Sequence, residues 1–205
     1  AHRQPASGFP LNRPGPARVP PEVLFHLMHR RVDLHGGVAV LGWRLRVLVI
    51  PEQHSRILQH VSGQDGNDKL FGGTGDDTLI GHDGDDSLFG HDDADILFGG
   101  IGDDRASGGS GADILDGGDG RDRLLGNDGP DILDGGPSHD FLSGGQGWDE
   151  LTGGTGNDYL DGGAGTMDSL IGGDGKDTIR DHFGGASIVG GGNGADDIRI
   201  TFTKS

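Results

Sequence analysis

The sequence has no cysteine among its 205 residues, few aromatic residues (5%), and about half as many basic as acidic side chains, 16 against 33. The lack of cysteine excludes a disulfide framework, a cysteine-ligated zinc site and a thiol nucleophile. The formal net charge of -17 argues against a nucleic-acid binder that neutralises phosphates, and it favours a cationic partner. The longest apolar run, Val38 to Ile50, contains two arginines and is far shorter than the roughly 20 residues of a transmembrane helix, so no transmembrane segment is expected.

Glycine is in large excess, at 44 of 205 positions, against a usual frequency of roughly 7%. Its distribution divides the chain at Ser62. Residues 1–62 contain five glycines, seven of the nine prolines, eight basic and three acidic residues, whereas the remainder carries a net charge of -22. This change of composition predicts a boundary between an N-terminal segment, residues 1–62, and a domain that begins at Gly63.

The N-terminal segment is rich in proline and arginine. Its proline-rich start is typical of an extended linker, and we expect residues 1–21 to be disordered. Farther along, Val38–Leu41 and Val47–Ile50 predict two short strands that would cap the next domain. No clean apolar stretch with a small-residue cleavage site follows the early arginines, so a signal peptide is not expected.

From Gly63 onward the sequence repeats every nine residues. The clearest copy is residues 72–80, Gly-Gly-Thr-Gly-Asp-Asp-Thr-Leu-Ile. The fourth position is almost always glycine, as expected where a tight turn needs a positive φ angle, and the exceptions are Asp93 and Ser138. Loops that lack such glycines predict weaker binding sites.

Two further positions of the repeat hold one type of residue in almost every copy. One of them predicts a buried core and the other a line of acidic side chains. The eighth position is aliphatic in each copy, so we expect one side chain per repeat to point into a core, thinnest at Ala106 and ending with Ile188 and Ile198. The sixth position is aspartate in every copy except a degenerate one that has Ala186. These aspartates are Asp68, Asp77, Asp86, Asp95, Asp104, Asp113, Asp122, Asp131, Asp140, Asp149, Asp158, Asp168, Asp177 and Asp196.

The column pattern Gly-Gly-x-Gly-x-Asp-x-aliphatic-x over residues 63–199 resembles the RTX repeat, also called the hemolysin-type calcium-binding nonapeptide. The resemblance implies an all-β protein, a right-handed parallel β-roll or β-solenoid, in which six residues of each repeat form a loop and three a short strand. Two repeats would complete one turn, and residues 200–205 would follow as a C-terminal strand or tail.

The resemblance also implies that Ca2+ ions lie between loops stacked on the same edge, held by the sixth-position aspartates and by loop carbonyls. Stacked loops would be two repeats apart, so the aspartates fall into two rows with room for at most about 12 ions. Their charge would nearly cancel the -22 of this region. Carboxylate and carbonyl oxygens suit calcium better than magnesium, which demands stricter geometry.

Nine residues that bury about one leucine gain too little apolar burial to offset the conformational entropy that they lose on folding. Stacked aspartate rows add repulsion. We therefore expect the array to be disordered without cations and to fold when calcium binds.

The resemblance implies a calcium-binding module that is extracellular, either secreted or on a bacterial cell surface. Such a module would pass unfolded through type I secretion machinery and fold outside. An alternative is the C-terminal fragment of a larger secreted RTX hydrolase, toxin or adhesin. We expect no enzymatic activity in this chain, because His26–His29 is not a His-Glu-x-x-His motif and Gly108–Ala112 lacks the last glycine of Gly-x-Ser-x-Gly.

Overall fold

The computed structural model describes residues 38–40, 47–48, 60–165, 167–182 and 188–200, and these residues form strands and turns with no helix. The expected disorder of residues 1–21, the position of Ala186 and residues 201–205 lie outside the described residues. The strands are β1 (Val38–Val40), β2 (Val47–Leu48), β3 (His60–Asp65), β4 (Lys69–Thr74), β5 (Thr78–Asp83), β6 (Ser87–Asp92), β7 (Ile96–Ile101), β8 (Arg105–Ser110), β9 (Ile114–Asp119), β10 (Arg123–Asp128), β11 (Ile132–Pro137), β12 (Phe141–Gln146), β13 (Glu150–Thr155), β14 (Tyr159–Gly163), β15 (Ser169–Asp174), β16 (Thr178–Asp181), β17 (Ile188–Asn193) and β18 (Asp197–Ile200).

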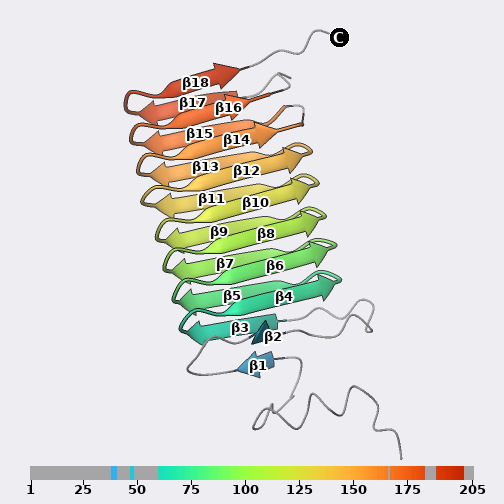
Figure 1. The fold of residues 1–205 in the computed structure, drawn as a ribbon. Helices are drawn as coiled ribbons and strands as arrows, with labels where there is room; N and C mark the ends of the chain where they lie inside the picture. Colours follow the sequence, from blue (N-terminus) through green and yellow to red (C-terminus); the bar gives the residue numbers. More distant parts are fainter. Residues whose placement is uncertain (1–37, 41–46, 49–59, 166, 183–187, 201–205) are drawn as a thin grey trace, which may run out of the picture. The chain divides into compact units, whose positions relative to one another are not determined.

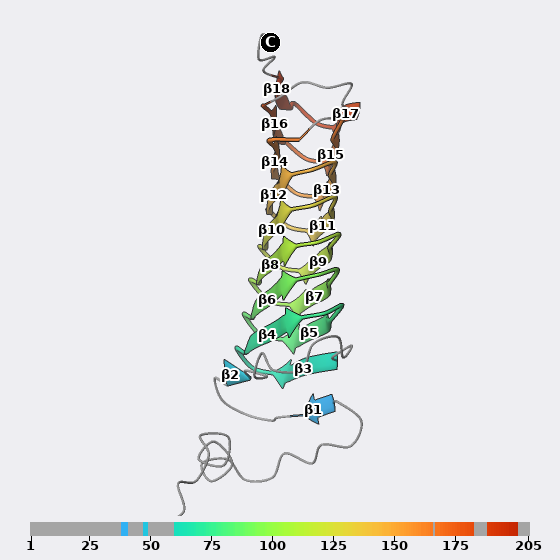
Figure 2. The same cartoon turned by 90° about the vertical axis from the view of Figure 1, so that its right-hand side faces the viewer.

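Successive strands enter two different sheets. The odd-numbered strands form a nine-stranded sheet in the order β1 to β17, here called the odd sheet, and the even-numbered strands form the even sheet, from β2 to β18. Neighbouring strands are parallel and in register, so that Leu70 pairs with Leu88 one coil later. Two repeats therefore make one coil, and the coils stack into a column with the sheets on opposite sides (Figures 1 and 2). This arrangement confirms the predicted parallel β-solenoid.

Two of the strands lie in the N-terminal segment. β1 pairs with β3, and β2 pairs with β4, within the two short apolar runs that predict strands there. The sheet ladder thus begins ahead of Gly63, and β3 already starts at His60. The structure describes no helix that could cross a membrane.

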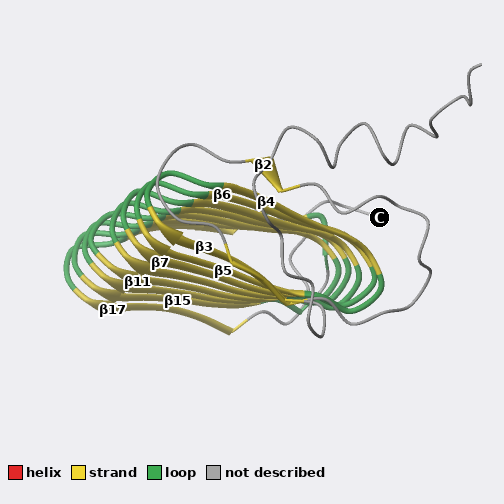
Figure 3. Cartoon of the chain, turned by 90° about the horizontal axis from the view of Figure 1, so that it is seen from below, coloured by secondary structure: helices red, strands yellow, loops and turns green. Residues whose placement is uncertain are grey.

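The strands are longer and the turns shorter than expected. Most strands have six residues, as in β4, which leaves three residues of each repeat for the turn. Figure 3 shows these turns at both ends of the flattened coils. The expected division into six-residue loops and three-residue strands is therefore wrong. The reason is that the second and third positions of the repeat still pair across coils, Gly73 with His91 and Thr74 with Asp92.

The backbone has a positive φ angle at two positions of the repeat. The fourth position behaves as predicted, and Asp93 and Ser138 keep the geometry without glycine, at φ values of 76° and 94°. The second position also has positive φ, 114° at Gly73 and 86° at His91, which we did not expect. Glycine is common at both positions because it alone adopts this conformation without a steric penalty.

The core lies between the two sheets and consists of two rows of aliphatic side chains, one row from each sheet. The eighth-position residues from Leu70 to Ile179 are at most 2% exposed, and Val61 occupies the same place in the first coil. Ala106 is buried between Leu88 and Leu124 in the even sheet, which agrees with a thin layer there.

The prediction fails for the last two core positions. Val189, not Ile188, pairs with Leu170 in the odd sheet, at a separation of 19 rather than 18 residues, and Val189 packs against the core. Ile198 lies on β18, the last strand of its sheet, and is 43% exposed.

Candidate metal sites at the loop edges

The sixth-position aspartates form one row along each edge of the solenoid, where the turns stack. In each row the backbone N–H of one aspartate donates to Oδ1 of the aspartate one coil later, at 2.6 Å from Asp86 to Asp104 and 2.8 Å from Asp95 to Asp113. The first row is Asp68, Asp86, Asp104, Asp122, Asp140, Asp158, Asp177 and Asp196. The second row is Asp77, Asp95, Asp113, Asp131, Asp149 and Asp168. These hydrogen bonds confirm the two stacked rows that the resemblance implies.

The aspartate rows are buried. All of the sixth-position aspartates except Asp196 are at most 5% exposed, although nothing about an acidic turn residue requires burial. Eleven of them have a buried Oδ2 with no hydrogen-bond partner in the described part of the chain. They are Asp86, Asp95, Asp104, Asp113, Asp122, Asp131, Asp140, Asp149, Asp158, Asp168 and Asp177. A buried carboxylate oxygen without a donor is costly unless a cation or a proton compensates it.

Burial also changes the proton affinity of these carboxyl groups. Loss of solvation raises the pKa of Asp104 and Asp122 from 3.8 to about 7, and neighbouring aspartates of the row add to the rise. The backbone hydrogen bond that each carboxylate accepts lowers the pKa but does not cancel this effect. The pKa values of Asp86 and Asp140 rise to about 6 for the same leading reason. The rows thus strongly favour any neutralising charge.

The first-position glycines leave space beside these oxygens. A Cβ added to Gly72 would lie 2.7 Å from Oδ2 of Asp77, in the same repeat, and 2.9 Å from the carbonyl oxygen of Gly90, one coil later. The contact with the carboxylate recurs at the other first-position glycines, and the contact with a carbonyl oxygen of the adjacent coil recurs at most of them, so that the two oxygens lie close to one point. A side chain at this position would fill the space.

The donors at these edges are the kind that calcium uses. In the described part of the chain, no three His, Cys, Asp or Glu side chains gather in a group that could hold a metal ion. An ion between coils would therefore take one or two carboxylates together with backbone carbonyls. Such an all-oxygen set, with adaptable geometry, fits Ca2+.

The two loops that lack glycines keep the same arrangement. Asp95 and Asp140 are buried in their rows like the other aspartates, although Asp93 and Ser138 replace the fourth-position glycine in these loops. Their backbone geometry is thus retained, while the predicted weakness of their sites stays a prediction.

A second ladder along the first edge was not predicted. Here the side chain of the fifth-position residue accepts a hydrogen bond from the backbone N–H of the fifth-position residue one coil later. The Asp103 N–H donates to Oδ1 of Asp85, and the Arg121 N–H donates to Oδ1 of Asp103, both at 3.0 Å. The direction is opposite to that of the sixth-position ladder. Asn67, Asp85 and Asp103 at this position are a recognisable signal, because short polar side chains can bond to a stacked backbone.

A parallel solenoid whose edges carry rows of buried carboxylates defines a class of repeat protein built to bind metal ions. The sequence matches the RTX calcium-binding nonapeptide repeat, four copies to a match, at residues 62–97, 89–124, 98–133, 116–147, 125–160 and 143–179. These matches cover more than half of the 205 residues, and the chain belongs to this family. No curated protein matches the sequence. The family and the fold both fit calcium binding.

Proposed function

We propose that Ca2+ ions bind between neighbouring coils along both aspartate rows and that this binding folds the solenoid. The observation that carries the proposal is the series of buried Oδ2 atoms without a hydrogen-bond donor. Consecutive aspartates of each row, together with loop carbonyls, would hold the ions, at no more than about 12 positions. The bound ion supplies positive charge where the rows concentrate negative charge.

The narrow core supports the dependence on calcium. Each repeat from Leu70 to Ile179 contributes one buried aliphatic side chain to a core only two rows wide, and each also buries a carboxylate. Apolar burial of this size does not offset the ordering of nine residues together with an uncompensated buried charge. The free energy of ion binding is therefore free energy of folding.

We also propose that the protein works outside a bacterial cell, after passing unfolded through type I secretion machinery. Membership of the RTX family supports this location. A fold that forms at about 0.1–1 mM calcium, the range of extracellular calcium modules, would be absent inside the cell and present outside. Its role is binding and stability rather than catalysis.

Isothermal titration of the full chain with Ca2+ tests the calcium sites. We expect several ions to bind, no more than about 12, with dissociation constants of about 0.1–1 mM, and Mg2+ to produce a much smaller response. Replacing Asp113, in the middle of the second row, with Asn lowers the number of bound ions, whereas replacing the exposed Asp128 with Asn does not. Absence of calcium binding, or equal binding of Mg2+, would contradict the proposal.

A further inference from the structure

The two outer faces of the solenoid differ in charge. Side chains at the seventh and ninth positions of the repeat point outward on both sheets. On the odd sheet the charged side chains at these positions include Asp116, Asp134 and Glu150. On the even sheet they include five of the seven Lys and Arg residues that the structure describes. These five are Lys69, Arg105, Arg123, Arg180 and Arg199.

Most of these cations have no acidic partner. Within the described ranges, Arg199 pairs with Asp197, at 2.6 Å from Nη2 to Oδ2, but Lys69, Arg105, Arg123 and Arg180 lie within ion-pair distance of no carboxylate. The chain has 33 acidic residues, so the absence of a described carboxylate beside these four cations indicates that they do not serve to balance the acidic loops. Cations that only balanced the acidic loops would lie beside them, as Arg121 and Lys176 do.

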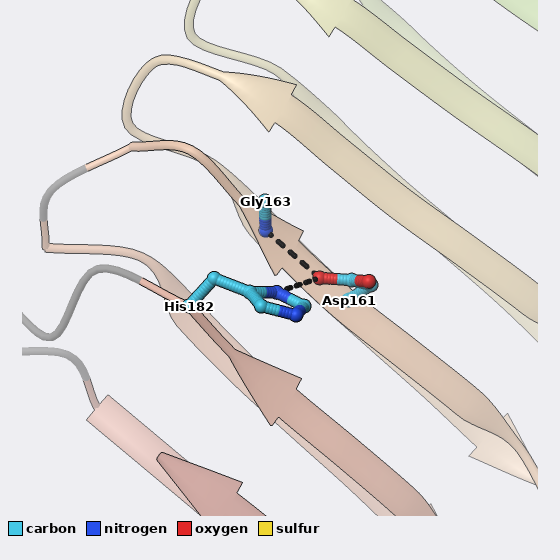
Figure 4. A network of polar contacts seen from close by, with 3 residues as sticks. All are labelled: Asp161, Gly163 and His182. Carbon is cyan, nitrogen blue, oxygen red and sulfur yellow. Dashed lines mark hydrogen bonds and ion pairs between the residues drawn. The ribbon is translucent and has the colours of Figure 1, made fainter. Parts of the chain in front are cut away.

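The two acidic side chains at the seventh and ninth positions of this face are already occupied. Asp161 pairs with His182, at 3.0 Å from Oδ1 to Nδ1, and accepts a hydrogen bond from the Gly163 N–H at 3.1 Å (Figure 4). Asp197 accepts from Arg199. The uncompensated charge on the even-sheet face is therefore positive.

Aromatic rings hold two of the arginines in place. Across β10, β12, β14 and β16, the guanidinium carbon of Arg123 lies 4.2 Å from the ring centroid of Phe141, which stacks on Tyr159 at 5.0 Å, and Arg180 lies 5.2 Å from the Tyr159 ring. A guanidinium that stacks through its face keeps its N–H donors at its edge. Arg105 lies in register with Arg123 on the neighbouring strand. These arginines of the even sheet, here called the arginine row, therefore offer preorganised hydrogen-bond donors for carboxylate groups.

The arginine row ends at a cavity. Arg180, Asp181, His182 and Arg199 line a cavity of about 250 Å³ at the end of the even sheet. Arg180 and Arg199 are paired in register on β16 and β18. The cavity thus extends the line of cations and is large enough for a small polar group of a bound chain.

We propose that the outer face of the even sheet binds an acidic polysaccharide that runs along the stack of coils. Arg105 and Arg123 lie on the neighbouring strands β8 and β10, about 4.8 Å apart, and Arg180 lies on β16, three strands beyond β10 in the even sheet, so that spaced carboxylates of a linear polyanion accept bidentate hydrogen bonds from them. The cavity beyond Arg180 would accept the end of the chain.

The surroundings of the arginine row favour a single polysaccharide chain with carboxylate groups over other polyanions. Exposed aspartates of the stacked loops, including Asp76, Asp85 and Asp103, lie along the edges that flank the face, and an anionic membrane would be repelled by them. Single-stranded nucleic acid binds by stacking bases on open ring faces. Here Phe141 and Tyr159 cover each other and are capped by arginines.

Binding of a fluorescent hyaluronan oligosaccharide to the full chain in calcium tests the proposal. We expect binding that weakens with salt, and an affinity about tenfold lower for each arginine removed in Arg105→Ser/Arg123→Ser. The matched variant Arg121→Ser/Lys176→Ser removes the same charge from the loops and should leave the affinity nearly unchanged. Arg105→Lys/Arg123→Lys keeps the charge, loses the bidentate geometry and should bind with intermediate affinity.

Circular dichroism in calcium verifies that each variant is folded and separates this proposal from the proposed calcium function. If the wild type does not bind hyaluronan, or if both serine variants lose affinity equally, the polysaccharide site is wrong. Equal or tighter binding of polyglutamate, a DNA oligonucleotide or anionic vesicles would also overturn it. None of these results bears on calcium binding.

Discussion

Asp103 and Asp104 are consecutive residues of one loop, yet they occupy different environments. Asp104 is 1% exposed, accepts one hydrogen bond from the Asp86 N–H and buries its other oxygen without a donor in the described part of the chain. Asp103 is exposed and accepts from the N–H of Arg121. Both side chains link adjacent coils through Oδ1. Burial of the second oxygen is what distinguishes a candidate ligand from a carboxylate that only supports the turn.

The largest expected difference between buried and exposed carboxylates is in the effect of pH. Burial raises the pKa of Asp95, Asp104 and Asp131 to about 7 in the fold without metal, against about 3.9 in an unfolded chain. Groups with raised pKa values stabilise the fold fully below about pH 4, and this contribution is lost as the pH rises through about 7.

We therefore expect the chelated protein to gain strand signal in circular dichroism as the pH falls from about 8 to about 5. The calcium-saturated protein should lose stability over the same range, because protons compete with the metal for the carboxylates. Two pH profiles that run in the same direction would contradict the assignment of the buried rows as the calcium ligands.

Replacement of one buried aspartate should have the next largest effect. Asp104→Asn removes a carboxylate that faces two inter-coil positions, so up to about two ions are lost, each worth about 2.7 kcal/mol at 100 times the dissociation constant. The adjacent control Asp103→Asn should change the free energy of unfolding by less than about 0.5 kcal/mol. Calcium stoichiometry and urea unfolding in calcium measure both. Similar losses in the two variants would remove the distinction between the two carboxylates.

Filling the space beside a buried carboxylate should cost less. In Gly72→Ala the added methyl group would meet Asp77 Oδ2 at 2.7 Å and the Gly90 carbonyl at 2.9 Å, and we expect a loss of about 1–3 kcal/mol with weaker calcium binding. Gly190→Ala is the control, since nothing lies within 4 Å of its Cβ position. If Gly72→Ala left the stability and calcium binding unchanged, the added methyl group would not crowd these two oxygens, and the prediction would be wrong. Thermal unfolding in calcium gives the comparison.

The smallest effect concerns a strained turn next to a buried aspartate. Ser138 has a φ angle of 94°, so Ser138→Gly should raise stability by about 1 kcal/mol. Asp93 has a φ angle of 76°, but its Oδ2 accepts from the Gly75 N–H at 3.0 Å, so Asp93→Gly should give no gain. Equal gains would mean that backbone strain alone controls these two loops. Urea unfolding in calcium distinguishes the two cases.

The nine-residue pattern and the family that it resembles were together enough to predict the parallel solenoid and both aspartate rows. A repeat that alternates between two sheets brings residues 18 apart into register, so Asp86 must stack on Asp104 once the coil is known. The copy that contains Asp168 is one residue longer, and the row continues through it, because the Asp149 N–H still donates to Asp168 at a separation of 19 residues.

Other features of the fold depend on three-dimensional contacts and could not be predicted from the residues that recur at each position of the repeat. The strands extend through Gly73 because glycine backbones pair across coils. Val189, rather than Ile188, takes the register position opposite Leu170, since either aliphatic residue suits a degenerate copy. The cations of the even sheet lie in variable columns, and Arg123 and Phe141 meet only because their strands are neighbours.

Circular dichroism of the full chain at neutral pH, in excess chelator and again in millimolar Ca2+, measures directly whether calcium folds the solenoid. Calcium-dependent folding predicts a disordered spectrum in chelator and a strand spectrum once calcium is restored. A strand spectrum that persists unchanged in chelator would show that the buried carboxylates are compensated without calcium, and the account would be wrong.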